Sequence, residues 1–224
     1  SASLVGSEMC IRDRGSTAKL FAQILNKAPI DIFLSADQST IQKIPDNKKI
    51  KVSKFTYAIG SLIIFSKAKI DNQIKFENKL LKRLSNKIVI ANPKFSPYGR
   101  ASKQVLESLG IFSLFENKII LASNINQVSS FIYSGNVDLG IISNSDKLKL
   151  KKYELGYFKE IPQNLYSPIK QDVILLENAK NNNKAKLFFN FLKSKDTKKI
   201  IKSFGYRVTA VSYTHLTLPT NRCV

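Results

Sequence analysis

The chain has 224 residues, 43% of them hydrophobic, and its 36 Lys and Arg against 16 Asp and Glu give a formal charge of +20. This length and apolar content are sufficient for one or two globular domains with a substantial core. The longest apolar stretch, residues 57–66, contains Gly60 and Ser61, so no membrane-spanning helix is predicted, and the composition excludes a collagen, a coiled coil and a disordered chain.

The two ends of the chain differ from the rest of it. They hold all of its Met, His and Cys residues, which are Met9, Cys10, His215 and Cys223. Residues 1–14 and 211–224 resemble translated sequencing-adapter DNA, and we expect both segments to be artefacts. The alternative is a Cys10–Cys223 disulfide or a Cys/His metal site, but Cys and His without a ligand spacing are a weak signal for either.

The core that remains, residues 15–210, contains no Cys, His or Met, which excludes thiol catalysis, a histidine general base and a zinc site. The ends contribute three Arg against one Asp and one Glu, so the core keeps a charge of +19. This charge is mostly scattered Lys, whereas nucleic-acid-binding surfaces more often combine Arg-rich patches with aromatic residues. We expect no nucleic-acid partner, and keep a basic nucleic-acid or acidic-surface binding module as an alternative.

The first part of the core predicts a helix, a strand and a second helix. Residues 16–28 place their apolar side chains on one helical face, with Ser16 and Thr17 at the N-cap and Pro29 after the end. Residues 30–36 (IDIFLSA) predict a buried strand, and a short helix starts at Asp37. Residues 55–66 are typical of β-structure.

From residue 87 the sequence alternates between strands and helices. The predicted elements are strand 87–91, helix 99–109 closed by Gly110, strand 118–122, helix 125–134 closed by Gly135, and strand 138–143. Helices on both crossovers predict parallel strands in a sheet buried on both faces, and such sheets bind ligands at the carboxyl ends of their strands. A strand at 171–177 and helices at 182–194 and 196–204 complete an α/β pattern.

The core carries no recognisable catalytic or nucleotide-binding motif, so we expect a protein that is not an enzyme. Three predicted helix starts, at residues 15–17, 97–99 and 123–125, are candidate anion sites, because first-turn N–H groups are unpaired and the helix dipole is positive there. The alternative is that Ser16, Thr17 and Asn124 only cap their helices. We interpret Asp37 and Asp172 as capping or hinge residues.

The residues at these helix starts resemble the periplasmic molybdate-binding proteins, the solute-binding subunits of ABC importers. The resemblance extends from residue 15 to 206, and its matching stretches are GSTAKLFAQI, APIDIFLSADQ, FTYAIGSLIIFS, IVIANPKFSPYGRASKQVLESLG, NINQVSSFIYSGNVDLGII and LYSPIKQDVILLE. The resemblance implies an α/β fold like that of type II periplasmic binding proteins, with two α/β lobes and a ligand cleft between them. Lobe one would comprise residues 15–64 and 168–210, and lobe two residues 65–167.

The resemblance also implies a site that holds a tetrahedral oxyanion by neutral hydrogen bonds. Ser16 and Thr17 would bind it from lobe one through hydroxyls and amides, while Tyr98 and Ile125 would each offer a backbone N–H from lobe two. Ser143 stands where part of the family has a ligand Tyr. We expect no cofactor and no protein ligand to a metal, since molybdenum would be bound as its oxyanion.

The implied function is capture of molybdate, and of tungstate, in the periplasm by a monomer that delivers the anion to an ABC permease and its ATPase. A binding protein for another oxyanion, such as sulfate, is the alternative. Members of the family begin with a strand and a helix before the turn that matches residues 15–17, and the loop between them supplies further hydroxyl ligands. We expect residues 1–14 to stand in place of this unit and of a signal peptide, which would make the chain a truncated fragment.

Overall fold

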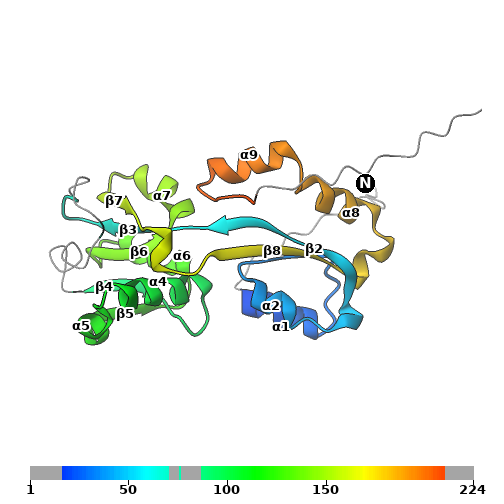
Figure 1. The fold of residues 1–224 in the computed structure, drawn as a ribbon, viewed down its shortest axis with the longest axis horizontal. Helices are drawn as coiled ribbons and strands as arrows, with labels where there is room; N and C mark the ends of the chain where they lie inside the picture. Colours follow the sequence, from blue (N-terminus) through cyan, green and yellow to red (C-terminus); the bar gives the residue numbers. More distant parts are fainter. Residues whose placement is uncertain (1–16, 71–75, 77–86, 210–224) are drawn as a thin grey trace, which may run out of the picture.

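The protein is an α/β fold built on two separate β-sheets. The computed structural model describes residues 17–70, 76 and 87–209. Within these residues, three strands form a small sheet in the order β1-β8-β2, and five form a large sheet in the order β5-β4-β6-β3-β7. The two sheets follow one another along the long axis of the molecule, each with its own helices (Figure 1). We call each sheet with its helices the small lobe and the large lobe.

The small sheet is antiparallel throughout, with β8 between β1 and β2. Ile174 and Leu176 of β8 face α1 and α2, whereas Val173 and Leu175 face α8, as the alternation of side chains along a strand requires. The helices and strands of this lobe are α1 (Thr17–Leu25), β1 (Ile32–Ser35), α2 (Gln38–Gln42), η1 (Asp46–Lys48), β2 (Lys49–Gly60), β8 (Ile169–Leu176), η4 (Glu177–Asn181), α8 (Asn183–Phe191) and α9 (Lys195–Ser203).

The large sheet is mixed. Strand β4 runs parallel to β5 and to β6, as the alternation of strands and helices predicted, but β3 pairs antiparallel with β6 and with β7. The elements of this lobe are β3 (Leu62–Ser66), β4 (Ile88–Ala91), α4 (Pro97–Ser108), α5 (Phe112–Phe115), η2 (Glu116–Lys118), β5 (Ile119–Ala122), α6 (Ile125–Tyr133), β6 (Leu139–Ser143), α7 (Asn144–Lys151), β7 (Tyr157–Glu160) and η3 (Gln163–Leu165).

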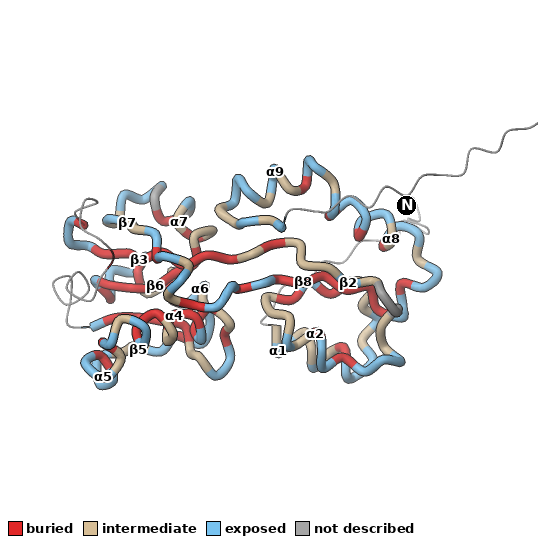
Figure 2. Tube along the Cα trace, viewed as in Figure 1, coloured by how far each residue is buried: buried red, intermediate tan, exposed pale blue. Residues whose placement is uncertain are grey.

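Two hydrophobic clusters cover the faces of the large sheet. Leu62 and Ile64 of β3 join α4 and α5 in one cluster, and Ile63 and Phe65 join α6 in the other. Strands β3, β4 and β6 are buried along their whole length, so this sheet is the core of its lobe (Figure 2). The predicted burial on both faces is therefore confirmed for the central strands.

Two predicted helix ends, at Gly110 and Gly135, are confirmed, whereas the predicted start of one helix is wrong. Gly110 and Gly135 end α4 and α6 with positive φ values of 64° and 76°, a conformation that glycine adopts without a steric penalty. Helix α4, however, begins at Pro97 and not at residue 99, because Ser96 acts as its N-cap. Proline is favoured at the first helical position, where its missing N–H costs no hydrogen bond.

The chain passes between the lobes at two adjacent places, from β2 through Ser61 into β3 and from η3 into β8. These crossings lie side by side, because Gly60 pairs with Ile169 in the small sheet. A third segment returns to the same place, where Ile59 and Arg207 exchange backbone hydrogen bonds of 2.7 and 2.9 Å. We call this region, residues 57–61, 168–172 and 205–207, the junction.

A buried chain of side-chain hydrogen bonds joins the junction to α4. Gln171 donates from Nε2 to the Tyr98 hydroxyl at 2.8 Å and accepts at Oε1 from the Tyr57 hydroxyl at 2.9 Å. Gly60 packs directly against the Tyr98 ring, so that a Cβ at this position would overlap the phenol. The side chain of Tyr98 thus lies between the two crossings and connects them to the helix that carries it.

Burial raises the pKa of Tyr57 and of Tyr98 above the ordinary phenol value of 10.0, and the nearby Tyr206 raises both further. A phenol whose folded pKa is raised binds its proton in the folded state at pH values where the unfolded chain has released it. Its contribution to stability is therefore fully present below about pH 10 and decreases as the pH rises above that value.

We accordingly expect the free energy of unfolding to decrease between about pH 10 and pH 11, with a slope that approaches about 1.4 kcal/mol per pH unit for each phenol. Urea unfolding across this range tests this, with Tyr57→Phe as the comparison, because lysines titrate in the same range in both proteins. The variant loses its hydrogen bond at every pH but should show a shallower decrease. Equal slopes in the two proteins would contradict the assignment.

A substitution at Gly60 tests the packing of the junction. Gly60→Ala forces a methyl group against the Tyr98 phenol, and we expect it to lower the free energy of unfolding by about 1 to 3 kcal/mol. Tyr98→Phe removes the hydroxyl, which is the atom that the new Cβ would meet first. The double variant should therefore lose less stability than the sum of the two single losses in urea unfolding. Additive losses of unfolding free energy would show that the side chains at positions 60 and 98 do not interact.

Candidate functional site

The helices of the large lobe start at the edge of the sheet that faces the junction. Strands β4, β5 and β6 are parallel, so their carboxyl ends share one edge, and α4, α6 and α7 follow these ends. Strand β3 enters the sheet at this same edge, because its first residue, Leu62, pairs with Ser143 at the end of β6. Three helix N-termini are thereby directed toward the small lobe.

Two helix N-termini of the small lobe meet them. Strand β1 ends at Ser35, which pairs with Asp172 of the junction, and α2 starts shortly afterwards. The Ala36 amide donates to the Thr17 hydroxyl oxygen at 3.3 Å, which places the start of α1 beside the turn between β1 and α2. We call these five helix starts, at Thr17, Asp37, Ser96, Asn124 and Ser143, the N-terminal cluster.

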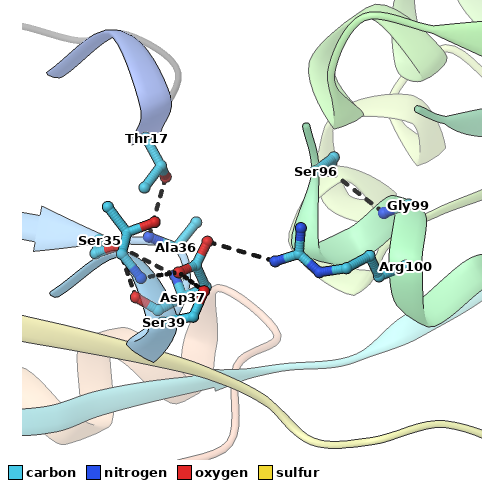
Figure 3. A network of polar contacts seen from close by, with 9 residues as sticks. Thr17, Ser35, Ala36, Asp37, Ser39, Ser96, Gly99 and Arg100 are labelled. Carbon is cyan, nitrogen blue, oxygen red and sulfur yellow. Dashed lines mark hydrogen bonds and ion pairs between the residues drawn. The ribbon is translucent and has the colours of Figure 1, made fainter. Parts of the chain in front are cut away.

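Figure 3 shows two parts of the N-terminal cluster facing each other. Thr17 and the turn from Ser35 to Ser39 lie on the small lobe, and the first turn of α4, from Ser96 to Arg100, lies opposite. The Arg100 guanidinium reaches across, with Nη2 3.6 Å from Oδ2 of Asp37. The arrangement brings together residues that are far apart in the sequence.

The start of α4 leaves one backbone donor available. Ser96 caps the helix, since its Oγ accepts from the Gly99 amide at 3.3 Å, and the Arg100 amide donates to the Ser96 carbonyl at 3.0 Å. Pro97 has no N–H, so the Tyr98 amide remains, and at the second helical position it has no intrahelical acceptor. Gly99 lets the helix start this close to β4, because a Cβ there would overlap the Ala91 carbonyl.

Helix α6 repeats this geometry. Asn124 is its N-cap and accepts from the Gln127 amide at 3.0 Å, which confirms the capping interpretation for this residue. The Ile125 amide occupies the first helical position, where no intrahelical acceptor exists. Capping and anion binding are therefore compatible here, because the cap uses the amide of the third helical residue and leaves that of the first.

Helix α7 differs in that its cap is fully engaged. Ser143 is buried, accepts from the Asp146 amide at 3.3 Å and lies 2.8 Å from the Asp146 carboxylate, to which its hydroxyl donates. The same hydroxyl lies 2.9 Å from that of Ser145. A serine whose hydroxyl caps its own helix and bonds a carboxylate is poorly suited to bind an anion as well.

The predicted site residues therefore have different outcomes. Thr17, Tyr98 and Ile125 all lie at helix starts of the N-terminal cluster, the first on the small lobe and the other two on the large lobe. Their role as anion ligands stays a prediction. Ser16 lies outside the described residues.

The interpretation of Asp37 as a capping residue is confirmed, since its Oδ1 accepts from the Thr40 amide at 2.7 Å. The prediction from sequence missed two residues of the site, Ser96 and Arg100. Ser96 precedes a proline, and a Ser-Pro pair before an apolar helix is a start signal that could have identified it. No local pattern indicates that Arg100 reaches the other lobe.

The electrostatic character of the cluster suits a small anion. Its donors are backbone amides at the positive ends of helices together with the Thr17 hydroxyl, and the charges of Arg100 and Asp37 compensate each other. Over residues 17–70, 76 and 87–209, no group of three or more His, Cys, Asp and Glu side chains could hold a metal ion. Nor does this described part contain a helix long and apolar enough to cross a membrane.

Comparison with known proteins agrees with this geometry. The molybdate-binding protein ModA of Azotobacter vinelandii is 36% identical over 194 residues, which is 86% of this chain and 76% of that protein. ModA of Rhodobacter capsulatus is 34% identical over 195 residues, covering 86% and 75% respectively. The solved structure of the Azotobacter vinelandii periplasmic molybdate-binding protein superimposes with a TM-score of 0.76 at 31% identity, covering 88% of this chain and 87% of that one.

The family model described as bacterial extracellular solute-binding protein matches residues 12–207. Its members bind solutes for transporters and are not enzymes, which confirms the expectation drawn from the missing catalytic motifs. The similarity to solved structures of this kind likewise confirms the predicted fold class. The chain therefore belongs to the bacterial extracellular solute-binding protein family.

Proposed function

We propose that this chain is a substrate-binding protein that captures molybdate, and tungstate with it, for an ABC importer. The observation that carries the proposal is the N-terminal cluster, in which helix starts from the two lobes face each other (Figure 3). The Tyr98 and Ile125 amides of this cluster have no intrahelical acceptor. Its support from the comparisons is that the relatives named above are molybdate-binding proteins. The alternatives, a sulfate-type binding protein and a basic nucleic-acid module, have no comparable support.

The proposed ligands are the Thr17 hydroxyl from the small lobe and the Tyr98 and Ile125 amides from the large lobe, together with Ser16. A tetrahedral dianion that leaves water loses its hydration, and fixed N–H and O–H donors at helix N-termini replace it. Tyr98 and Ile125 supply such amides without losing intrahelical bonds. We leave Ser143 out of the site because its hydroxyl is engaged with Asp146.

Selectivity in this proposal comes from distance. Donors on two rigid lobes define a span, and an anion that is too small cannot contact all of them at once. Molybdate and tungstate are larger than sulfate, although all three are tetrahedral dianions. The site would therefore discriminate by size and not by charge.

The remaining parts of the proposal concern the cell. We place the protein in the periplasm as a monomer, with an ABC permease and its ATPase as partners and no cofactor. In support, the solved relative is a periplasmic protein and the matching family is extracellular.

We also propose two lobes, one of residues 15–61 and 168–210 and the other of residues 62–167. The first crossing moves from residue 64 to Ser61 because β3 begins at Leu62.

Calorimetric titration of the purified chain tests this function. We expect molybdate and tungstate to bind at least about tenfold more tightly than sulfate, because only the larger anions span the donors of both lobes. Their affinity should change little between low and physiological salt, whereas a nucleic-acid-binding protein would lose affinity steeply over that range. Equal affinity for sulfate would overturn the assignment of the anion.

A second test removes one proposed ligand. Thr17→Val keeps the shape of the side chain but deletes its hydroxyl, and we expect about two- to tenfold weaker molybdate binding, the loss of one hydrogen bond. Thr40→Val makes the same chemical change on α2, where the contact of Thr40 with Asp37 uses the backbone amide, and should leave the affinity unchanged. Thermal unfolding of both variants separates binding from stability. Unaltered binding by Thr17→Val would remove this residue from the site.

A further inference from the structure

An ion pair connects the two lobes at the N-terminal cluster. Nη2 of Arg100 on α4 lies 3.6 Å from Oδ2 of Asp37 at the start of α2, and the Asp37 side chain is only 15% exposed. The pairs Lys103–Glu107 and Lys67–Asp138 differ in that both of their members belong to the large lobe. An interaction between lobes depends on their relative position, and one within a lobe does not.

The Asp37 carboxylate is held in place by the small lobe. Its Oδ1 accepts from the Thr40 amide at 2.7 Å and from the Ser39 hydroxyl at 2.9 Å, while the Asp37 amide donates to the Ser35 hydroxyl oxygen at 3.2 Å. These bonds do not use Oδ2, which faces the large lobe (Figure 3). Arg100 therefore meets an acceptor that is already ordered, which lowers the entropic cost of forming the pair.

On the other side, Arg100 belongs to the same helical turn as a proposed anion donor. It follows Tyr98 by two residues, and its own amide is bonded to the Ser96 carbonyl at 3.0 Å. The position of the Tyr98 amide and the position of the Arg100 backbone are therefore coupled through α4. A contact that holds Arg100 against α2 also holds the Tyr98 amide toward the small lobe.

We propose that Asp37 and Arg100 form a closure contact, which stabilises the arrangement of the lobes in which their donors face each other and slows the release of a bound anion. The proposal rests on the proposed function. Arg100 is in this view a positioning residue that acts through the Tyr98 amide. Asp37 has two roles, one oxygen capping α2 and the other closing the lobes.

Rate constants separate this role from a general effect of charge. Charges near a site act mainly on the association rate, whereas short-range contacts act mainly on the dissociation rate. If Asp37 only repelled the incoming dianion, its removal would accelerate association and would not accelerate dissociation. If it holds the lobes together, its removal must accelerate dissociation. The two possibilities therefore predict changes in different rate constants of the same variant.

The experiment measures molybdate dissociation by stopped-flow mixing for the full chain and three variants: Asp37→Asn, Arg100→Gln and the double variant. Asparagine remains a good N-cap, so Asp37→Asn keeps α2 intact. We expect each single substitution to raise the dissociation rate about two- to fivefold, the range for one partly exposed ion pair. The double variant should dissociate no faster than Arg100→Gln, because the contact can be lost only once.

Two further variants serve as controls. Lys103→Gln removes one positive charge from the same helix. It breaks contacts within the large lobe, which are the ion pair with Glu107 and the contact of the Lys103 ammonium with the Phe112 ring, so the dissociation rate should not change. Arg100→Lys keeps the charge and should restore part of the slow dissociation. Unchanged or slower dissociation in Asp37→Asn, or additive effects in the double variant, would overturn the closure contact.

Small-angle X-ray scattering without any anion gives a readout that does not depend on molybdate. Loss of the contact should increase the radius of gyration of the double variant relative to the parent chain and to Lys103→Gln. If the parent chain binds no molybdate but the scattering changes as expected, the proposed function fails and the closure contact stands. If molybdate binds but neither the scattering nor the dissociation rate responds to the variants, the closure contact fails and the proposed function stands.

Discussion

The packing of the Tyr98 side chain against the junction is the constraint on which the rest of the site depends. Its hydroxyl bonds Gln171 of β8, its ring lies on Gly60 of β2, and its backbone belongs to the first turn of α4. Since Gly99 brings the same helical turn against the end of β4, the first turn of α4 is held from both sides. The Tyr98 amide is therefore positioned by the same contacts that connect the lobes.

Buried polar contacts hold each lobe together, whereas a more exposed polar contact connects the two lobes. Within the small lobe, buried Asp172 accepts from the Thr56 hydroxyl at 2.7 Å and from Gln38 at 3.0 Å, which ties α2 to the sheet. Buried networks of this kind are costly to break, because each partner would be left unpaired. The half-exposed Arg100 exchanges its ion pair for water at little cost. Rigid lobes with a weak contact between them are what reversible binding requires.

The sequence predicted correctly those helices and strands that are determined by residues close together in the chain. Strand and helix alternation from residue 87 to 143, and the closing glycines Gly110 and Gly135, follow from periodicity and backbone preference. The antiparallel pairing of β3 with β6 and β7 depends on residues far away in the chain, and no local pattern contains it. Helix α9 forms close to the predicted range 196–204, but its burial does not follow residue polarity, since Ile200 and Phe204 are exposed while Thr197 is buried.

The candidate site shows the same division within a single side chain. Asp37 at the start of a short helix predicts a cap, and its Oδ1 does cap α2. Its Oδ2 faces Arg100, a partner supplied by the other lobe, so only the folded arrangement of both sheets brings the two together. Local preference therefore accounts for one oxygen of the carboxylate and tertiary structure for the other. The resemblance placed Tyr98 and Ile125 in the site without Arg100, because it concerns the atoms proposed to touch the anion and not those that hold the lobes around it.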